Sequence, residues 1–383
     1  MGRSDGRASR CAGAVGLLFL ATGCERFTHA GEYEILYPED YEGFCTACPE
    51  ESGLRHPPCP VASSAADKPE LFVYVWRYYE LGFDPQAWMG PEADKFDLGY
   101  DLDCSSRLPT GRPALCQPRT LEDQSEGTPW IPLPHGIDNA LTQRILGPLF
   151  LKAQALGQDA ALDKGINESI AKGGSSVLIA VENWNGTPND PKVTARIVSV
   201  AGISEANGGP PRWDGSDLWD ALSDGADPES PFGAPSTTFK SNDAYVARGT
   251  LVLDLRSLGV ADLTVVNKGA RLSIPLHEFA VVGDITETEL RNVSVVGKWS
   301  HADMTRSSSD MADFLAGCDP LKSAYLVSVF PDLIDTAPDV PLAREGATNL
   351  ACDAMSVGYG AEAFRAKVGG FRPVSSLPSG CSP

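Results

Sequence analysis

The stretch that decides the fold class is residues 244–299, AYVARGTLVLDLRSLGVADLTVVNKGARLSIPLHEFAVVGDITETELRNVSVVGKW. Its apolar residues come in short runs rich in valine, leucine and isoleucine, and glycine, aspartate or asparagine separates the runs. Such runs, bounded by turn residues, are typical of strands that pair with their neighbours. We therefore expect strands at 244–247, 249–255, 262–266, 271–276, 279–282 and 292–299.

The strand pattern extends toward the N-terminus. Residues 71–79, LFVYVWRYY, and 177–181, VLIAV, predict buried strands, and residues 192–198 alternate as a half-buried strand does. A further short strand is expected at 96–102. Many short strands between turn signals favour an antiparallel β-sandwich, of jelly-roll or lectin-like type with long loops, over a parallel sheet.

A few helices are expected beside the strands. Apolar residues recur every three or four positions over 138–157, which predicts one helix of about 20 residues that Pro148 can kink. Shorter helices are expected at 158–170, 302–316 and 361–368, and residues 202–241 predict a long loop. No clear strand is expected after Trp299. The expected fold class is mainly β.

The first 24 residues predict export. Arg3, Arg7 and Arg10 precede an apolar segment at 11–21 that is too short to span a bilayer, as in a signal peptide. The segment 20–24, LATGC, resembles a bacterial lipobox, with Ala21 where leucine is usual, and so predicts a lipid on Cys24. The alternative is an ordinary signal peptide cleaved nearby. The expected organisation is a signal peptide at 1–23, a lipid-anchored, cysteine-rich tether at 24–69 and a β-sandwich domain at 70–383.

The charge of the chain excludes two kinds of partner. The formal net charge is −20, and the signal peptide holds three arginines and one aspartate, so the mature chain is near −22. Nucleic acid needs a basic surface, and so does electrostatic docking on anionic lipid. The membrane partner is therefore expected through the lipid anchor alone, at the cell envelope, with no nucleic acid bound.

The cysteines predict disulfides. Apart from Cys11 and Cys24, the chain has eight: Cys45, Cys48, Cys59, Cys104, Cys116, Cys318, Cys352 and Cys381. An even set in an exported chain is typical of disulfide bonding. Spacing does not determine the pairing, and Cys104–Cys116 and Cys318–Cys352 are the most economical local pairs. Cys45 and Cys48 form a C-x-x-C that could instead be redox-active or bind zinc.

One acidic cluster has the composition of a calcium site. Asp101 and Asp103 alternate in an extended segment, with Asp97 before them, so both point to one side. Asp138 and Asn139 add oxygens at a helix start, and Ca²⁺ prefers six to eight such ligands. We expect a structural Ca²⁺ bound by Asp101, Asp103, Asp138 and Asn139. The alternative is a helix cap at Asp138 with solvated turns.

A second candidate site lies in the long loop. Trp213, Asp214, Asp217 and Trp219 combine aromatic faces with acceptors, a pattern that suits a carbohydrate ligand. The tryptophans could equally close the end of the core. Asn183, Asn185 and Asp190 are turn residues first, because a hairpin between the flanking strands explains them.

Catalytic motifs are absent from the sequence. It contains no G-x-S-x-G and no H-E-x-x-H, and its five histidines are scattered singly. The first hypothesis is therefore a non-enzymatic envelope protein that binds a carbohydrate or protein ligand. The alternative is a glycan-active hydrolase using a carboxylate pair, and a purely structural envelope component is a third reading.

Four sequence segments resemble those of a known group of proteins. They are FDLGYDLDC at 96–104, GIDNAL at 136–141, VENWNGTPNDPKV at 181–193 and CDAMSVG at 352–358. Together they resemble uncharacterised exported bacterial lipoproteins with lectin-like sandwiches of the laminin-G or concanavalin type. The resemblance implies a sandwich core and no particular activity.

Overall fold

The computed structural model describes residues 57–80, 100, 116, 139–149, 162–222, 239–256, 259–342, 351–373 and 381. The strands are β1 Phe72–Glu80, β2 Ser176–Glu182, β3 Asp190–Ile203, β4 Leu218–Leu222, β5 Phe239–Ala247, β6 Thr250–Asp254, β7 Val260–Asn267, β8 Ala270–Ile285, β9 Glu289–Ser300, β10 Ala354–Arg365 and β11 Lys367–Arg372. The helices are the π-helix η6 Leu141–Leu146, α4 Leu162–Ala171, the short η7 Glu205–Asn207, α5 His301–Ala316 and α6 Pro320–Thr336.

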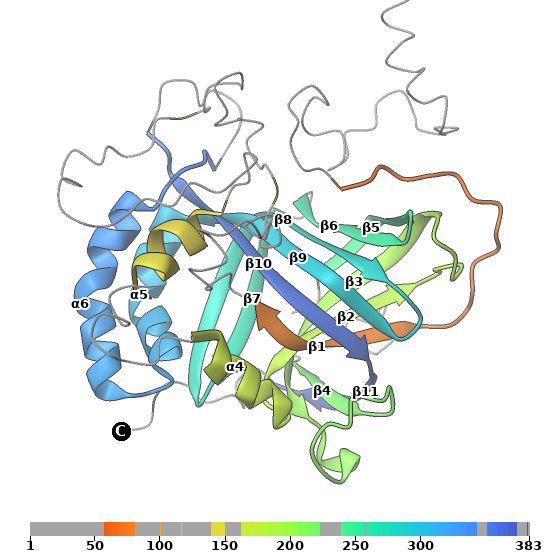
Figure 1. The fold of residues 1–383 in the computed structure, drawn as a ribbon, viewed down its shortest axis with the longest axis horizontal. Coiled ribbons are helices and arrows are strands. Elements are labelled where there is room, and N and C mark those ends of the chain that lie inside the picture. The colour runs from red at the N-terminus through yellow and green to blue at the C-terminus, as the bar shows by residue number, and fades with distance from the viewer. Residues whose placement is uncertain are drawn as a thin grey trace, which may run out of the picture.

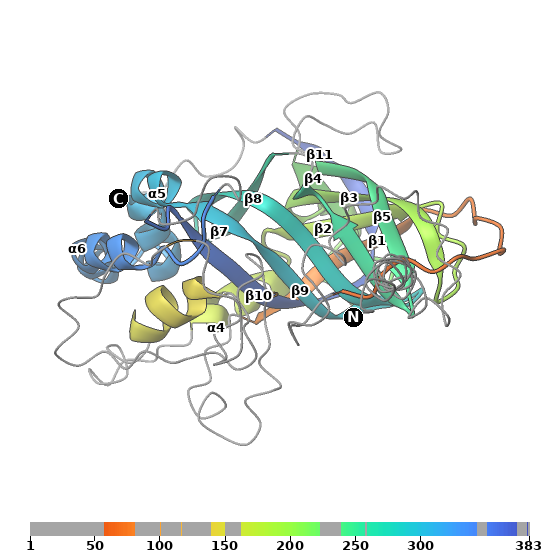
Figure 2. The same ribbon diagram turned by 90° about the horizontal axis from the view of Figure 1, so that it is seen from above.

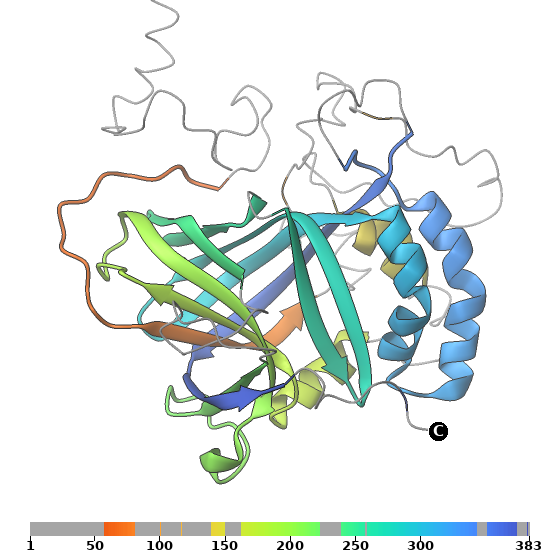
Figure 3. The same ribbon diagram turned by 180° about the vertical axis from the view of Figure 1, so that it is seen from behind.

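All these strands belong to one sheet. Its order is β11-β4-β3-β2-β1-β10-β9-β8-β6-β5, and β3 also pairs with β5. The extra pairing closes eight strands, β3, β2, β1, β10, β9, β8, β6 and β5, into an antiparallel ring (Figure 3). β4 and β11 continue from β3, and β7 forms a hairpin with β8. The mainly β class is confirmed.

The core occupies the inside of this ring. Along β1, Phe72, Tyr74 and Trp76 point inward into the main apolar cluster. Val73 and Val75 point outward and pack with a second cluster that includes Trp219 of β4. Successive side chains of a strand point to opposite faces. Both faces of β1 are therefore buried over residues 72–76, and this part of its sequence is a continuous apolar run.

Small residues of β10 make room for the aromatic residues of β1. Ala363 lies opposite Trp76, and Ala361 lies opposite Tyr79. All four are buried. Closed sheets are commonly filled by alternating large and small side chains, so these alanines belong to strand packing rather than to a helix.

Apart from the short η7, which lies beside β4, the helices gather at one end of the sheet. α5 and α6 pack side by side, and α5 lies against β8 and β9, while α4 lies against β1 (Figures 1 and 2). Ser300 caps the start of α5, and Gly317, with φ 56°, ends it. Within the described part of the chain, no helix is long and apolar enough to cross a membrane.

Several expected elements are observed, and some are corrected. The helix at 302–316 and the strand runs from 71 to 299 that fall in the described ranges are confirmed. The expected strands 271–276 and 279–282 are one strand, because β8 continues through a bulge at Glu278, which has φ 46°. The expected helix at 361–368 is wrong, because β1 and β9 pair with β10 on both edges.

Helix boundaries differ from expectation elsewhere. Residues 140–149 are helical, with a π-helical centre, and α4 covers most of the helix expected at 158–170.

Two elements were not expected from the sequence. The expected loop at 202–241 contains β4, and α6 follows α5. Asp319 caps α6 with Pro320 next to it, which is a recognisable start signal. The expected strand at 96–102 lies outside the described residues except for Tyr100.

The two local disulfide pairs expected from spacing are wrong. Cys116 is bonded to Cys352, and Cys318 is bonded to Cys381, with Cα–Cα distances of 5.1 and 5.2 Å. The fold brings each pair together across 236 and 63 residues, respectively, so spatial proximity rather than spacing sets the pairing. Cys59 is also in a disulfide. Cys24, Cys45, Cys48 and Cys104 lie outside the described residues.

Candidate ligand-binding site

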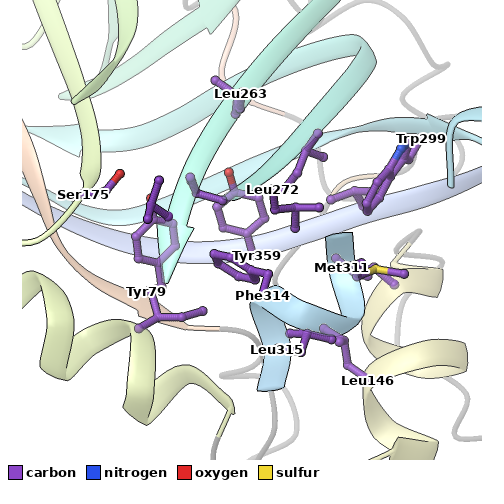
Figure 4. Close-up of a pocket in the computed structure, with 16 residues that line it drawn as sticks. Tyr79, Leu146, Ser175, Leu263, Leu272, Trp299, Met311, Phe314, Leu315 and Tyr359 are labelled. Atoms are coloured by element: carbon purple, nitrogen blue, oxygen red, sulfur yellow. The ribbon is translucent and has the colours of Figure 1, made fainter. Parts of the chain in front are cut away.

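An apolar cavity lies where the sheet meets the helices. Its walls come from the β7–β8 hairpin, the ends of β1 and β9, the interior of β10, and the helices η6, α4 and α5 (Figure 4). The cavity volume is about 90 Å³. Leu263 and Leu272 line it from the hairpin, and Met311 and Phe314 line it from α5.

The hairpin is shaped by its turn and tied to α5. Lys268 and Gly269 both have positive φ, as a two-residue type I′ turn requires. Asn267 next to the turn donates from Nδ2 to the carbonyl oxygen of Phe314 at 2.8 Å. This hydrogen bond joins the tip of the hairpin to the last turn of α5, and so sets the distance between two walls of the cavity.

A second tie holds α4 against the end of β1. The backbone N–H of Tyr79 donates to Oδ1 of Asn167 at 2.8 Å, and Nδ2 of Asn167 donates back to the carbonyl oxygen of Tyr79 at 2.9 Å. β2 pairs with β1 only at residues 72–75. The Asn167 amide therefore replaces a strand at Tyr79 and fixes where its ring enters the cavity.

The cavity has three hydroxyls on its lining, and Figure 4 places Tyr79, Tyr359 and Ser175 at the same end. The rings of Tyr79 and Tyr359 have centroids 5.9 Å apart. Ser175 Oγ donates to the carbonyl oxygen of Val200 at 2.9 Å. The Tyr79 hydroxyl is buried and has no hydrogen-bond partner.

The polar groups of the cavity are neutral. Burial raises the pKa of Tyr79 well above its ordinary value, with a further rise from nearby Tyr359, and burial also raises the pKa of Tyr359. Both phenols therefore stay protonated and can donate hydrogen bonds. Trp299, also on the lining, has an indole N–H without a partner. None of the sixteen lining residues is charged.

A polar groove lies where α4 meets β1 and β10. Arg77, Tyr78, Lys164, Asn167, Glu168, Ala171 and Glu362 line it, and its volume is about 670 Å³. It brings two carboxylates and two cations together on an open surface. The Arg77 guanidinium lies 5.4 Å from the ring centroid of Trp213 and 5.0 Å from that of Phe364, as a cation–π contact.

The structure brings the predicted tryptophans together. The ring centroids of Trp213 and Trp219 are 5.6 Å apart. Trp219 is fully buried against the outer face of β1 and β2, and Trp213 is half-buried at the rim. The sequence left two interpretations of this pair open, a ligand-binding platform or a plug of the core. The burial of Trp219 fits the plug. Of the two side chains, only Trp213 presents a face to a ligand.

The two aspartates of that loop have structural contacts. Asp217 is buried and accepts backbone N–H groups from Arg212 and Trp213, at 2.9 and 2.6 Å. Asp214 is exposed, and the hydroxyl and N–H of Ser216 bond to it and hold its pKa below the usual range. Asp217 therefore builds the loop that carries Trp213, and Asp214 is available at the surface.

Three of the four predicted calcium ligands, Asp101, Asp103 and Asp138, lie outside the described residues, as does the neighbouring Asp97. Asn139 is described and buried, and its Oδ1 accepts the N–H groups of Thr142 at 3.3 Å and of Gly358 at 3.1 Å. Asn139 thus caps the helix and joins it to β10. Within the described ranges, no three acidic, histidine or cysteine side chains are grouped as a metal site.

Sequence reasoning missed the cavity. Its lining comes from segments between Tyr79 and Tyr359, and each segment is an ordinary apolar run by itself. One signal was available in α5, because Met311, Phe314 and Leu315 are apolar residues near the end of a helix that is mostly polar before them. Comparison of the chain with protein-family models, with curated proteins and with solved structures finds no match.

Proposed function

We propose that this chain is a non-enzymatic binding protein of the cell envelope, held at a membrane by lipid on Cys24, and that its ligand occupies the apolar cavity. The cavity is the observation that carries the proposal. Binding sites for small molecules are typically concave and mostly apolar, with a few polar groups that orient the ligand. The three hydroxyls at one end of this cavity have that arrangement.

The lining supports binding over catalysis. General acid–base catalysis needs a group whose pKa lies near the operating pH. The titratable groups among the described lining residues are the two tyrosines, whose pKa values burial moves further from neutrality. A neutral, apolar lining favours retention of a ligand without chemistry.

Filling the cavity tests the proposal. The half-buried Leu315 lines it, so Leu315→Trp should occupy its space and abolish binding of a neutral apolar probe such as toluene. Leu321, which is 83% exposed on the neighbouring helix, offers the matched control Leu321→Trp. Binding should be measured by ligand-observed NMR on the full chain. No binding by the unsubstituted chain, or equal binding by both variants, would refute the proposal.

The anchor and the calcium site stay predictions. A fatty-acid analogue fed to producing cells should label the chain, and Cys24→Ser should abolish the label. Calcium should raise the melting temperature, since a ligand of the native state alone stabilises it, and Asp103→Ala should remove that response. The lectin-like sandwich is likewise a proposal, supported by two walls of the closed sheet that face each other across an apolar core.

A second candidate function rests on the polar groove. Glu168 and Glu362 both line it, and glycoside hydrolysis requires two carboxylates about 5–10 Å apart. Their position in one open groove that could admit a sugar chain supports the hydrolase alternative. Hydrolysis of glycans by the chain, lost in both Glu168→Gln and Glu362→Gln, would establish it. Activity unchanged in both variants would reject this pair.

A further inference from the structure

The hydroxyl end of the cavity carries an inference that rests on the proposed function. We propose that the ligand is a neutral molecule no larger than a substituted six-membered ring, with one hydrogen-bond acceptor such as a ketone, ester or ether oxygen. Tyr79 and Tyr359 would bind the acceptor, and the hydrocarbon part would lie between the β7–β8 hairpin and α5.

The size of the proposed ligand follows from the volume of the cavity. The cavity holds about 90 Å³. An engineered apolar cavity of about 150 Å³ in another protein stays dry and binds benzene. That cavity is larger than this one, so a six-membered ring is the upper limit for a ligand here and would be buried only in part. A longer tail would have to leave the cavity.

The neutrality of the proposed ligand follows from the residues that line the cavity. Among the described residues that line the cavity there is no lysine, arginine or histidine, so a bound carboxylate or phosphate would find no cation there to compensate its lost hydration. Burying an unpaired charge costs far more than burying a paired one. A bound ammonium would be equally uncompensated, because the sixteen described lining residues include no carboxylate either. The same walls accept apolar surface readily.

The hydrogen-bond acceptor on the proposed ligand follows from the hydroxyl group of Tyr79. Its hydroxyl is buried, has no partner and lies beside Tyr359. A buried donor without an acceptor raises the free energy of the empty site. A ligand oxygen between the two phenols would remove that cost. A hydrocarbon of the same shape would leave it in place.

The ends of the cavity differ, which orients the ligand. Figure 4 shows Tyr79 and Ser175 at one end, and Met311, Leu315 and Leu146 at the other. Asn167 fixes the backbone of Tyr79 and so the position of its phenol. The oxygen of the ligand should therefore face β1 and β10, and its ring should face α5 and η6.

Three probes of similar shape test the inference on the full chain: cyclohexanone, methylenecyclohexane and cyclohexanecarboxylate. Cyclohexanone should bind roughly tenfold more tightly than methylenecyclohexane, the range that one added hydrogen bond provides. Cyclohexanecarboxylate should not bind at pH 7. Tyr79→Phe and Tyr359→Phe, compared by NMR titration, should reduce the ketone preference singly and abolish it together, with binding of the hydrocarbon retained.

Each contrary result has its own meaning. Equal affinity for ketone and hydrocarbon, unchanged in the phenylalanine variants, would overturn the acceptor site while leaving the cavity as the binding site. Binding of the carboxylate would overturn the neutrality. Failure of all three probes to bind would overturn the proposed function and this inference together.

Discussion

The Asn167 side chain and the Tyr79 backbone exchange two hydrogen bonds, with donor–acceptor distances of 2.8 and 2.9 Å. Beyond residue 75, β1 has no strand on the side of β2, so the peptide groups of Tyr79 would otherwise be unpaired. Buried backbone N–H and C=O groups are almost always paired in folded proteins. One amide side chain thus completes the sheet edge and fixes a wall of the cavity.

Asn167→Ala should destabilise the fold. The change leaves both peptide groups of Tyr79 without partners, which costs about 1–3 kcal/mol of unfolding free energy for groups this buried. Glu168→Ala, at the exposed neighbour on α4, should change stability by less than about 0.5 kcal/mol. Urea unfolding measures both. Equal stability of the two variants would contradict the role given to Asn167.

Tyr74 and Tyr79 should respond differently to loss of the hydroxyl. Both are buried on β1, but the Tyr74 hydroxyl donates to the carbonyl oxygen of Thr286 at 2.6 Å, whereas that of Tyr79 has no partner. Tyr74→Phe should cost about 0.5–1.5 kcal/mol. Tyr79→Phe should be neutral or stabilising in the absence of ligand. A cost for Tyr79→Phe equal to that for Tyr74→Phe in chemical unfolding would show that the Tyr79 hydroxyl is partnered in solution.

The disulfides should map to distant pairs. Peptide mapping under non-reducing conditions should recover Cys116–Cys352 and Cys318–Cys381. The double variant Cys318→Ser/Cys381→Ser, which leaves no unpaired thiol of this pair, should lose about 2–5 kcal/mol of stability. Recovery of Cys318–Cys352 would contradict the fold around α5 and β10.

Strand prediction succeeded where both faces of a strand are buried. Phe72 to Trp76 is an apolar run, and Val293 to Trp299 is rich in valine and ends in tryptophan, so local composition alone indicates a strand. It failed for β10, where Ala361 and Ala363 are small because Trp76 and Tyr79 lie opposite them. Alanine favours helices when isolated, and only the paired strands override that preference.

The sites depend on three-dimensional contacts to different degrees. Trp213 and Trp219 are close in sequence, so their contact was predictable, but the burial of Trp219 under β1 and β2 was not. The cavity joins Tyr79, Leu272 and Tyr359, which no local pattern connects. The disulfides were missed for the same reason, because Cys116 and Cys352 meet only after the sheet has formed.

The buried tyrosines predict a loss of stability at alkaline pH. Burial raises the pKa of Tyr79 and Tyr359 above the value of about 10 that tyrosine has in an unfolded chain. Above that pH, the unfolded chain releases phenolic protons that the native state still holds. Their contribution to stability is therefore complete below about pH 10 and is lost as the pH rises toward the folded values, by up to about 1.4 kcal/mol per pH unit for each tyrosine.

Removing the two phenols should flatten this dependence. Unfolding free energies at pH 9, 10 and 11 should fall less steeply for Tyr79→Phe/Tyr359→Phe than for the unsubstituted chain, because other ionisations affect both chains alike. Phe314→Leu is the control, since it removes an aromatic ring from the same cavity without removing a titrating group. It should lower stability by a similar amount at each pH. If the double variant and the unsubstituted chain keep parallel pH profiles, the two phenols ionise alike in the folded and unfolded states, and the neutral, water-poor cavity argued from their burial is not present in solution.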